Sequence, residues 1–202
     1  MFLKSPPRLV LASTSRYRRE LLARLGIDFT IQAPAVDETP LASEAPLALV
    51  TRLALAKACC VAAADPQAWV IGSDQAAVLP LDAGGEEIVG KPGSAARCAE
   101  QLRRASGRSL RFLTAVAVVR SAGAERVEFV DTTRVDFRVL DEATIQRYVA
   151  RESPLDCAGG FKSEGLGISL CEAIHSEDPS ALIGLPLIRL AAALRTAGFE
   201  LP

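Results

Sequence analysis

The chain has 202 residues, half of them hydrophobic, and its 23 basic side chains nearly balance its 24 acidic ones. This length suffices for one well-buried domain or for two lobes that share a cleft. The balanced charge argues against a protein that coats nucleic acid through a broad basic face. No apolar run approaches the ~18 residues of a membrane span, and the first residues lack a signal-peptide pattern, so we expect a cytoplasmic protein without a membrane partner.

The first predicted unit is β-α-β. Residues 8–12 and 28–32 are apolar enough for strands, and the helix between them has Leu21, Leu22 and Leu25 on its inner face. This order favours an α/β fold.

The remaining elements follow the same hydrophobic patterns, and no linker or repeat divides the chain. We therefore expect one domain over residues 1–202, with a mixed twisted sheet and helices on both faces. In chain order we predict a helix over 46–64, a strand over 69–74 that ends in a small polar turn, a helix over 94–104, strands near 110–120 and 126–139, and helices over 141–149 and 186–197.

The segment from Leu9 to Arg19 carries the clearest chemical signal. An apolar strand leads into three hydroxyl residues, and the next helix opens with Arg16, Arg18 and Arg19. A helix N-terminus already has a partial positive charge, so arginines there are favourable when an anion joins them. Hydroxyls, backbone N–H groups and arginines can form a phosphate-binding corner. A solvated basic helix end is the alternative that this segment alone leaves open.

Other familiar motifs are incomplete. Gly85-x4-Gly90-Lys91 resembles a P-loop, but Pro92 follows where a Mg²⁺-binding hydroxyl is needed. The cysteines form no C-x-x-C pair, so neither a disulfide framework nor a zinc site is indicated. His175 is the only histidine, and we interpret it as structural or surface-exposed.

Two acidic segments could supply carboxylates to a ligand. Asp74 follows an apolar strand, and Asp37-Glu38 follows the second predicted strand. Ligands of open α/β sheets bind at such strand ends, although a turn-forming aspartate is the local alternative. Together with Arg18, Lys57 and Lys91, these carboxylates suit metal-assisted cleavage of a polyphosphate.

Short motifs occur in order along nearly the whole chain. They are Leu11-Ala12-Ser13-Thr14-Ser15, Arg18-Arg19, Ala35-Val36-Asp37-Glu38, Ile71-Gly72-Ser73-Asp74-Gln75, Gly90-Lys91-Pro92, Ser106-Gly107, the segment 157–165 and Gly184-Leu185-Pro186. This series resembles the Maf family of nucleoside triphosphate pyrophosphatases. Within it, Ser73-Asp74-Gln75 and residues 161–165 are similar to the 7-methyl-GTP pyrophosphatase branch. The dTTP/UTP branch favours a threonine after the catalytic aspartate and an arginine where Tyr17 stands.

The resemblance implies a two-lobed α/β fold of the Maf and inosine-triphosphatase type around a deep cleft, and hydrolysis of 7-methyl-GTP to 7-methyl-GMP and diphosphate. It also implies roles: Asp74 as proton acceptor, Tyr17, Gln75 and Glu164 in base specificity, Ser13, Arg18, Lys57 and Lys91 at the phosphates, and Glu38 with Asp74 at a divalent cation, Mg²⁺ or Mn²⁺. Arg16 departs from the family pattern, which usually has proline there.

A cationic 7-methylguanine ring fits this assignment. Tyr17 offers a face for a cation–π contact worth ~0.5–2 kcal/mol, whereas an arginine there would repel the ring. Glu164 could compensate the charge of the base. The structural alternatives are that Tyr17 packs on its own helix and that Glu164 caps a helix after Gly165.

The sequence leaves two rival functions open. One is a dTTP/UTP-type pyrophosphatase, and the other is a nucleotide-sensing regulator of cell division and septum formation. The partner is a small nucleotide in each case, and family analogy favours a homodimer.

Overall fold

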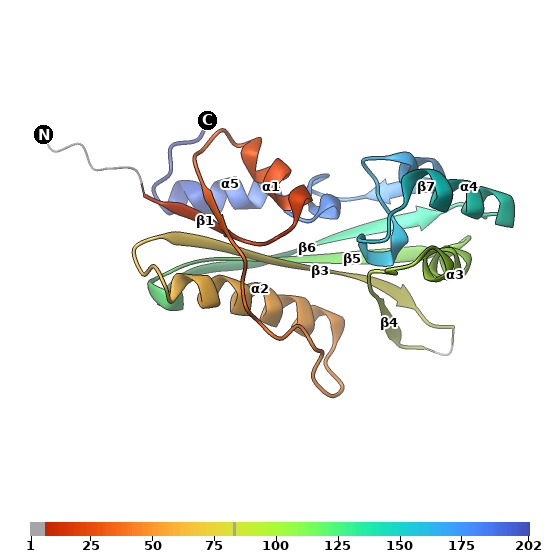
Figure 1. The fold of residues 1–202 in the computed structure, drawn as a ribbon, viewed down its shortest axis with the longest axis horizontal. Coiled ribbons are helices and arrows are strands. Elements are labelled where there is room, and N and C mark those ends of the chain that lie inside the picture. Colours follow the sequence, from red (N-terminus) through yellow and green to blue (C-terminus); the bar gives the residue numbers. More distant parts are fainter. Residues whose placement is uncertain (1–6, 83) are drawn as a thin grey trace, which may run out of the picture. The chain divides into compact units, whose positions relative to one another are not determined.

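The computed structural model describes residues 7–82 and 84–202, and it shows the mixed α/β architecture that the sequence predicts (Figure 1). The chain divides into two compact units. Unit 1 comprises the described residues up to Asp74, Thr114–Asp131 and Gly184–Pro202, and unit 2 comprises Gln75–Leu113 and Thr132–Ile183. The interpretation of residues 1–202 as one domain stays a prediction.

Unit 1 begins with the expected β-α-β unit. Strand β1 pairs in parallel with both β2 and β3. The two crossovers therefore run in opposite directions across the sheet, and right-handed connections place their helices on opposite faces. Figure 1 shows α2 on one face and α1 and α5 on the other. The bounds are β1 (Leu9–Ala12), α1 (Arg16–Ala23), β2 (Thr30–Gln32), α2 (Pro46–Ala62), β3 (Trp69–Pro80) and α5 (Leu187–Thr196).

The described strands form one mixed sheet in the order β2-β1-β3-β5-β6-β7, with β4 also paired to β3. Strands β3, β5 and β6 contribute residues to both units. The pairs β3–β4 and β6–β7 are antiparallel. The other elements are β4 (Glu86–Val89), α3 (Ala95–Ala105), β5 (Ser109–Arg120), β6 (Glu125–Phe137), α4 (Glu142–Glu152) and β7 (Cys171–His175).

One predicted strand is longer than expected, and two further strands were not predicted. Strand β3 does not end at Asp74 but continues to Pro80. The polar run Ser73-Asp74-Gln75 resembles a turn locally, yet Ala77 pairs with Val89 of β4 and the strand goes on. Sequence reasoning also missed β4 and β7, because each is short and half-exposed and so lacks a clear apolar alternation.

Each unit has a buried core of its own. In unit 1, Leu11 and Ile71 on neighbouring strands are fully buried. In unit 2, the ring of Phe161 lies 5.9 Å from that of Phe112 and 5.1 Å from that of Phe137, measured between centroids. Such tilted and edge-to-face contacts suit aromatic rings. No helix within the described residues is long and apolar enough to cross a membrane.

Candidate active site

A buried ammonium joins two carboxylates in unit 1. Lys57 Nζ lies 2.6 Å from Asp74 Oδ1 and 2.8 Å from Glu38 Oε1. The Lys57 side chain is 6% exposed and that of Asp74 is 12% exposed, whereas Glu38 is largely exposed. Burial of a charged group requires a partner, so Lys57 and Asp74 depend on each other, and Glu38 adds a second, exposed carboxylate to the ammonium.

Gly72 permits this contact because α2 crosses β3 very closely there. A Cβ atom at position 72 would lie 2.2 Å from the carbonyl oxygen of Ala54 and 2.7 Å from the backbone nitrogen of Ala58. Only glycine fits such an approach between helix and strand. Lys57 of α2 and Asp74 of β3 lie beside this crossing, and the close packing brings their side chains together.

The hydroxyls after β1 organise the start of α1. Ser15 is the N-cap and accepts a hydrogen bond from the backbone N–H of Arg18, and Ser13 accepts one from the backbone N–H of Ser15. The first turn of α1 contains no acidic side chain. The N-terminus therefore keeps its partial positive charge beside the arginines, as a phosphate-binding corner requires.

Arg18 is directed by a carbonyl far away in the sequence. Its Nε donates a hydrogen bond of 3.0 Å to the carbonyl oxygen of Gly184, which also accepts one of 3.0 Å from the Ser73 hydroxyl. Burial lowers the pKa of Arg18, while the charges of Asp74 and Glu38 act in the opposite direction. The two carboxylates therefore favour the charged form of the Arg18 guanidinium.

Tyr17 is in contact with Arg16, the residue that departs from the family pattern. Arg16 Nη2 donates a hydrogen bond of 2.7 Å to the Tyr17 hydroxyl, and the guanidinium carbon lies 4.7 Å from the centroid of the ring. The tyrosine therefore already engages one cation. Sequence reasoning could not assign a role to Arg16.

The other predicted site residues, Gln75, Lys91 and Glu164, belong to unit 2. Gln75 Nε2 donates hydrogen bonds of 3.0 Å and 3.1 Å to the carbonyl oxygens of Ala181 and Leu182. Lys91 is exposed, and the carbonyl of the preceding Gly90 accepts hydrogen bonds from the Gly159 backbone and from Gln101. The turn that presents Lys91 is thus fixed on two sides.

The segment with Glu164 is held by a pair that sequence reasoning missed. Lys162 Nζ lies 2.8 Å from Glu152 Oε1, and Glu152 Oε2 accepts a hydrogen bond of 2.7 Å from the backbone N–H of Leu166. A Cβ atom at Gly165 would lie 2.4 Å from that carboxylate. Glu164 itself is exposed. The spacing of Glu152 from this motif gives no sequence signal for the contact.

The carboxylates of Glu38 and Asp74 form a small acidic pair suited to a cation. Both lie within hydrogen-bond distance of the same ammonium, so each is directed toward a shared positive charge. Within the described residues, no group of three or more histidine, cysteine, aspartate or glutamate side chains could hold a metal ion. Two carboxylates nevertheless fit Mg²⁺, because Mg²⁺ often takes its remaining ligands from water and substrate phosphates.

These features describe an α/β protein whose cationic and acidic side chains suit a phosphorylated ligand. The chain belongs to the Maf family, since the family described as Maf-like protein matches residues 8–197.

Relatives of known name span nearly the whole chain. A "7-methyl-GTP pyrophosphatase" of Xanthomonas oryzae pv. oryzae is 55% identical over 97% of this chain and 100% of its own length. Proteins of the same name from Nitrosococcus oceani and Bordetella pertussis are 51% and 50% identical, each over 96% of this chain and over 96% and 94% of their own lengths. Among solved structures, the Staphylococcus aureus Ham1 protein is 18% identical, with a TM-score of 0.46 over 64% of this chain and 71% of that chain.

Proposed function

We propose that this chain is a pyrophosphatase that hydrolyses 7-methyl-GTP to 7-methyl-GMP and diphosphate. The observation that carries the proposal is the buried Lys57–Asp74 ion pair, which Glu38 joins. The names of relatives at 50–55% identity over nearly the full chain support the same reaction. We further propose that the protein acts in the cytoplasm and as a homodimer.

Asp74 is the proposed proton acceptor. Its carboxylate takes a proton from a water molecule as the water oxygen attacks the α-phosphorus. The bond from this phosphorus to the bridging oxygen breaks, and its electron pair leaves with the diphosphate. General-base assistance of this kind contributes about 10²–10⁴-fold to the rate. Lys57 holds the carboxylate in place through the contact of 2.6 Å.

Cationic groups bind the triphosphate in this proposal. In unit 1, Arg18 and Lys57 contribute positive charge and Ser13 adds a hydroxyl at the start of α1. The role of Lys91 at the phosphates rests on the family resemblance. Glu38 and Asp74 are the residues that would hold Mg²⁺ or Mn²⁺. When bound, such a cation neutralises negative charge on the phosphates and on the leaving diphosphate.

Side chains other than those at the phosphates recognise the base in this proposal. Tyr17 offers the cationic 7-methylguanine the face of its ring that Arg16 does not cover, and a cation–π contact is worth ~0.5–2 kcal/mol. Glu164 supplies a negative charge, and Gln75 a hydrogen-bonding amide. A tenfold preference among nucleotides requires only ~1.4 kcal/mol, so contacts of this size are sufficient.

Diphosphate release tests the proposal. Purified protein is incubated with 7-methyl-GTP and Mg²⁺, and Asp74→Asn serves as the variant. We expect the variant to keep the fold, measured by circular dichroism and thermal unfolding, and to lose turnover. A folded Asp74→Asn protein with unaltered turnover would exclude Asp74 as the base, and a wild-type chain that binds nucleotide without hydrolysis would favour the sensor function instead.

A further inference from the structure

Glu38 has to be placed by its surroundings, because nothing regular in the backbone holds it. It lies in the segment 33–45 between β2 and α2, which contains neither helix nor strand. The side chain is 61% exposed, yet its carboxylate meets the buried ammonium of Lys57 at 2.8 Å. Ordering a glutamate side chain on an irregular loop costs conformational entropy. Contacts that hold the backbone around Glu38 reduce this cost.

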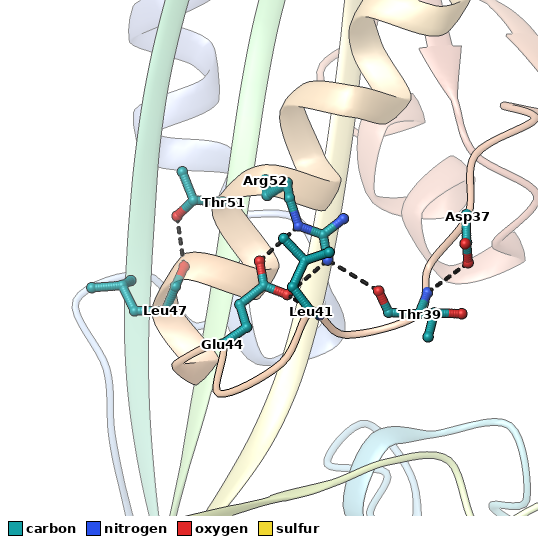
Figure 2. A network of polar contacts seen from close by, with 7 residues as sticks. All are labelled: Asp37, Thr39, Leu41, Glu44, Leu47, Thr51 and Arg52. Carbon is teal, nitrogen blue, oxygen red and sulfur yellow. Dashed lines mark hydrogen bonds and ion pairs between the residues drawn. The ribbon is translucent and has the colours of Figure 1, made fainter.

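Arg52 of α2 supplies such a contact directly beside Glu38. Its Nη2 donates a hydrogen bond of 3.2 Å to the carbonyl oxygen of Thr39, as Figure 2 shows. On the other side of Glu38, Asp37 Oδ1 accepts a hydrogen bond of 2.9 Å from the backbone N–H of Thr39. Both contacts fix the residue that follows Glu38, and the first one fastens it to the helix that carries Lys57.

Glu44 in turn fixes Arg52 and the end of the loop. Arg52 Nε and Nη2 donate to the two oxygens of Glu44 at 2.6 Å and 2.7 Å, and Glu44 Oε2 also accepts a hydrogen bond of 3.0 Å from the backbone N–H of Leu41 (Figure 2). The intervening Ser43 has a φ of 58°, a left-handed conformation that costs energy in a residue other than glycine. The Glu44 side chain is 7% exposed, so this strained turn closes over a shielded ion pair.

Helix α2 links the contacts of Arg52 with the loop to the contact of Lys57 with Glu38. Arg52 and Lys57 lie on the same rigid helix, so a loop fastened to Arg52 is fixed relative to Lys57. The planar fork of arginine can donate to both Glu44 oxygens and to the Thr39 carbonyl at once, which a lysine ammonium cannot do in the same geometry. We propose that Arg52 and Glu44 are positioning residues that hold the 37–44 loop so that the Glu38 carboxylate stays at its cation site. This inference rests on the proposed function of Glu38 as a cation ligand.

Binding of Mn²⁺ alone tests the inference without substrate. The free ion is followed by electron paramagnetic resonance in a titration of the full chain. Partners that orient a metal ligand typically change metal affinity by about 10–100-fold, so we expect Arg52→Lys to raise the Kd for Mn²⁺ by about tenfold. A double-mutant cycle with Glu38→Gln then measures the coupling. The double variant should bind no more weakly than Glu38→Gln alone, since Arg52 acts through Glu38.

A matched control separates positioning from general stability. Arg103 makes a similar two-point contact with Glu142 in unit 2, at 2.8 Å for both bonds, and lies on a helix without a proposed site residue. Arg103→Lys should leave the Kd for Mn²⁺ unchanged. Asp37→Ala should weaken Mn²⁺ binding more than Asp37→Asn does, because both variants lose the charge beside Glu38 while only the alanine variant also removes the acceptor that anchors Thr39.

Lower thermal stability of Arg52→Lys with an unchanged Kd, additive effects in the cycle, or an absence of saturable Mn²⁺ binding by the wild-type chain would each overturn the inference. Diphosphate release is assayed in parallel. A wild-type chain that binds Mn²⁺ through a coupled Arg52–Glu38 pair and releases no diphosphate would refute the proposed reaction while leaving the positioning role intact.

Discussion

The guanidinium of Arg16 lies over the ring of Tyr17, 4.7 Å from its centroid, and donates a hydrogen bond of 2.7 Å to the tyrosine hydroxyl. Arg16 thus holds Tyr17 in a defined orientation at the start of α1. Since the proposed role of Tyr17 rests on its ring face, the ring and the hydroxyl can be tested separately.

We expect Tyr17→Leu to lower the preference for 7-methyl-GTP over GTP by about two- to thirtyfold, the equivalent of a lost cation–π contact. Tyr17→Phe should retain most of the preference, because it keeps the ring. The ratio of kcat/KM values for the two nucleotides measures this effect. An unaltered ratio in Tyr17→Leu would rule out base recognition by the ring.

Removal of Lys57 should destabilise unit 1. Lys57→Met leaves the shielded carboxylate of Asp74 without its cation, and loss of one partner of a buried pair costs about 3–5 kcal/mol. The double variant Lys57→Met/Asp74→Leu should recover much of the free energy of unfolding and remain inactive, since apolar replacement of both charges removes the unpaired group. Urea denaturation and diphosphate release measure the two effects. Full stability of the single variant would contradict this account.

Gly72→Ala tests the close crossing of α2 and β3. The added methyl would collide with the α2 backbone at Ala54 and Ala58, and overpacking of this kind costs about 1–3 kcal/mol or more. The folded fraction should also lose activity, because the collision displaces α2 and so moves Lys57 away from Asp74. Gly90→Ala is the control, since a Cβ there meets nothing within 4 Å. Equal unfolding midpoints for the two variants would show that the crossing tolerates a side chain.

The Arg52–Glu44 pair predicts a pH dependence of stability. Hydrogen bonds from Arg52 and from the Leu41 backbone lower the pKa of Glu44 from 4.5 to about 2. A carboxylate with a lowered pKa in the folded state contributes stability above its unfolded pKa, and this contribution is lost as the pH falls. The stability difference between wild type and Glu44→Gln should therefore be constant above pH ~5 and shrink between pH 4.5 and about 2. Chemical denaturation at a series of pH values measures it, and a difference that stays constant through this range would contradict the ion pair.

Local sequence patterns were sufficient for most of the fold and insufficient for much of the site. The β-α-β opening followed from apolar spacing around Leu21 and Leu22, and α2 from the proline at its first turn. The sequence patterns did not predict that β3 continues beyond Asp74. Three polar residues interrupt the apolar run there, and the pairing partner β4 has only a weak strand pattern.

The parts of the site that the sequence did not predict depend on contacts between residues far apart in the chain. The backbone of Gly184 directs Arg18 across 166 positions of sequence, and Arg52 holds the loop of Glu38 through a carbonyl. Backbone acceptors are the same for every residue type, so no sequence pattern marks them. The roles of Tyr17, Gln75 and Glu164 stay predictions that rest on the family resemblance.

A comparison of nucleoside triphosphates under one condition tests the central claim most directly. The chain and its Asp74→Asn variant are incubated with Mg²⁺ and, separately, 7-methyl-GTP, GTP, dTTP or UTP, and the phosphorus products are identified by ³¹P nuclear magnetic resonance. We predict that the wild-type chain converts 7-methyl-GTP to 7-methyl-GMP and diphosphate in equal amounts, with a higher kcat/KM than for the other nucleotides, and that Asp74→Asn slows this reaction by about 10²–10⁴-fold. Release of orthophosphate, or faster hydrolysis of dTTP or UTP than of 7-methyl-GTP, would contradict the account.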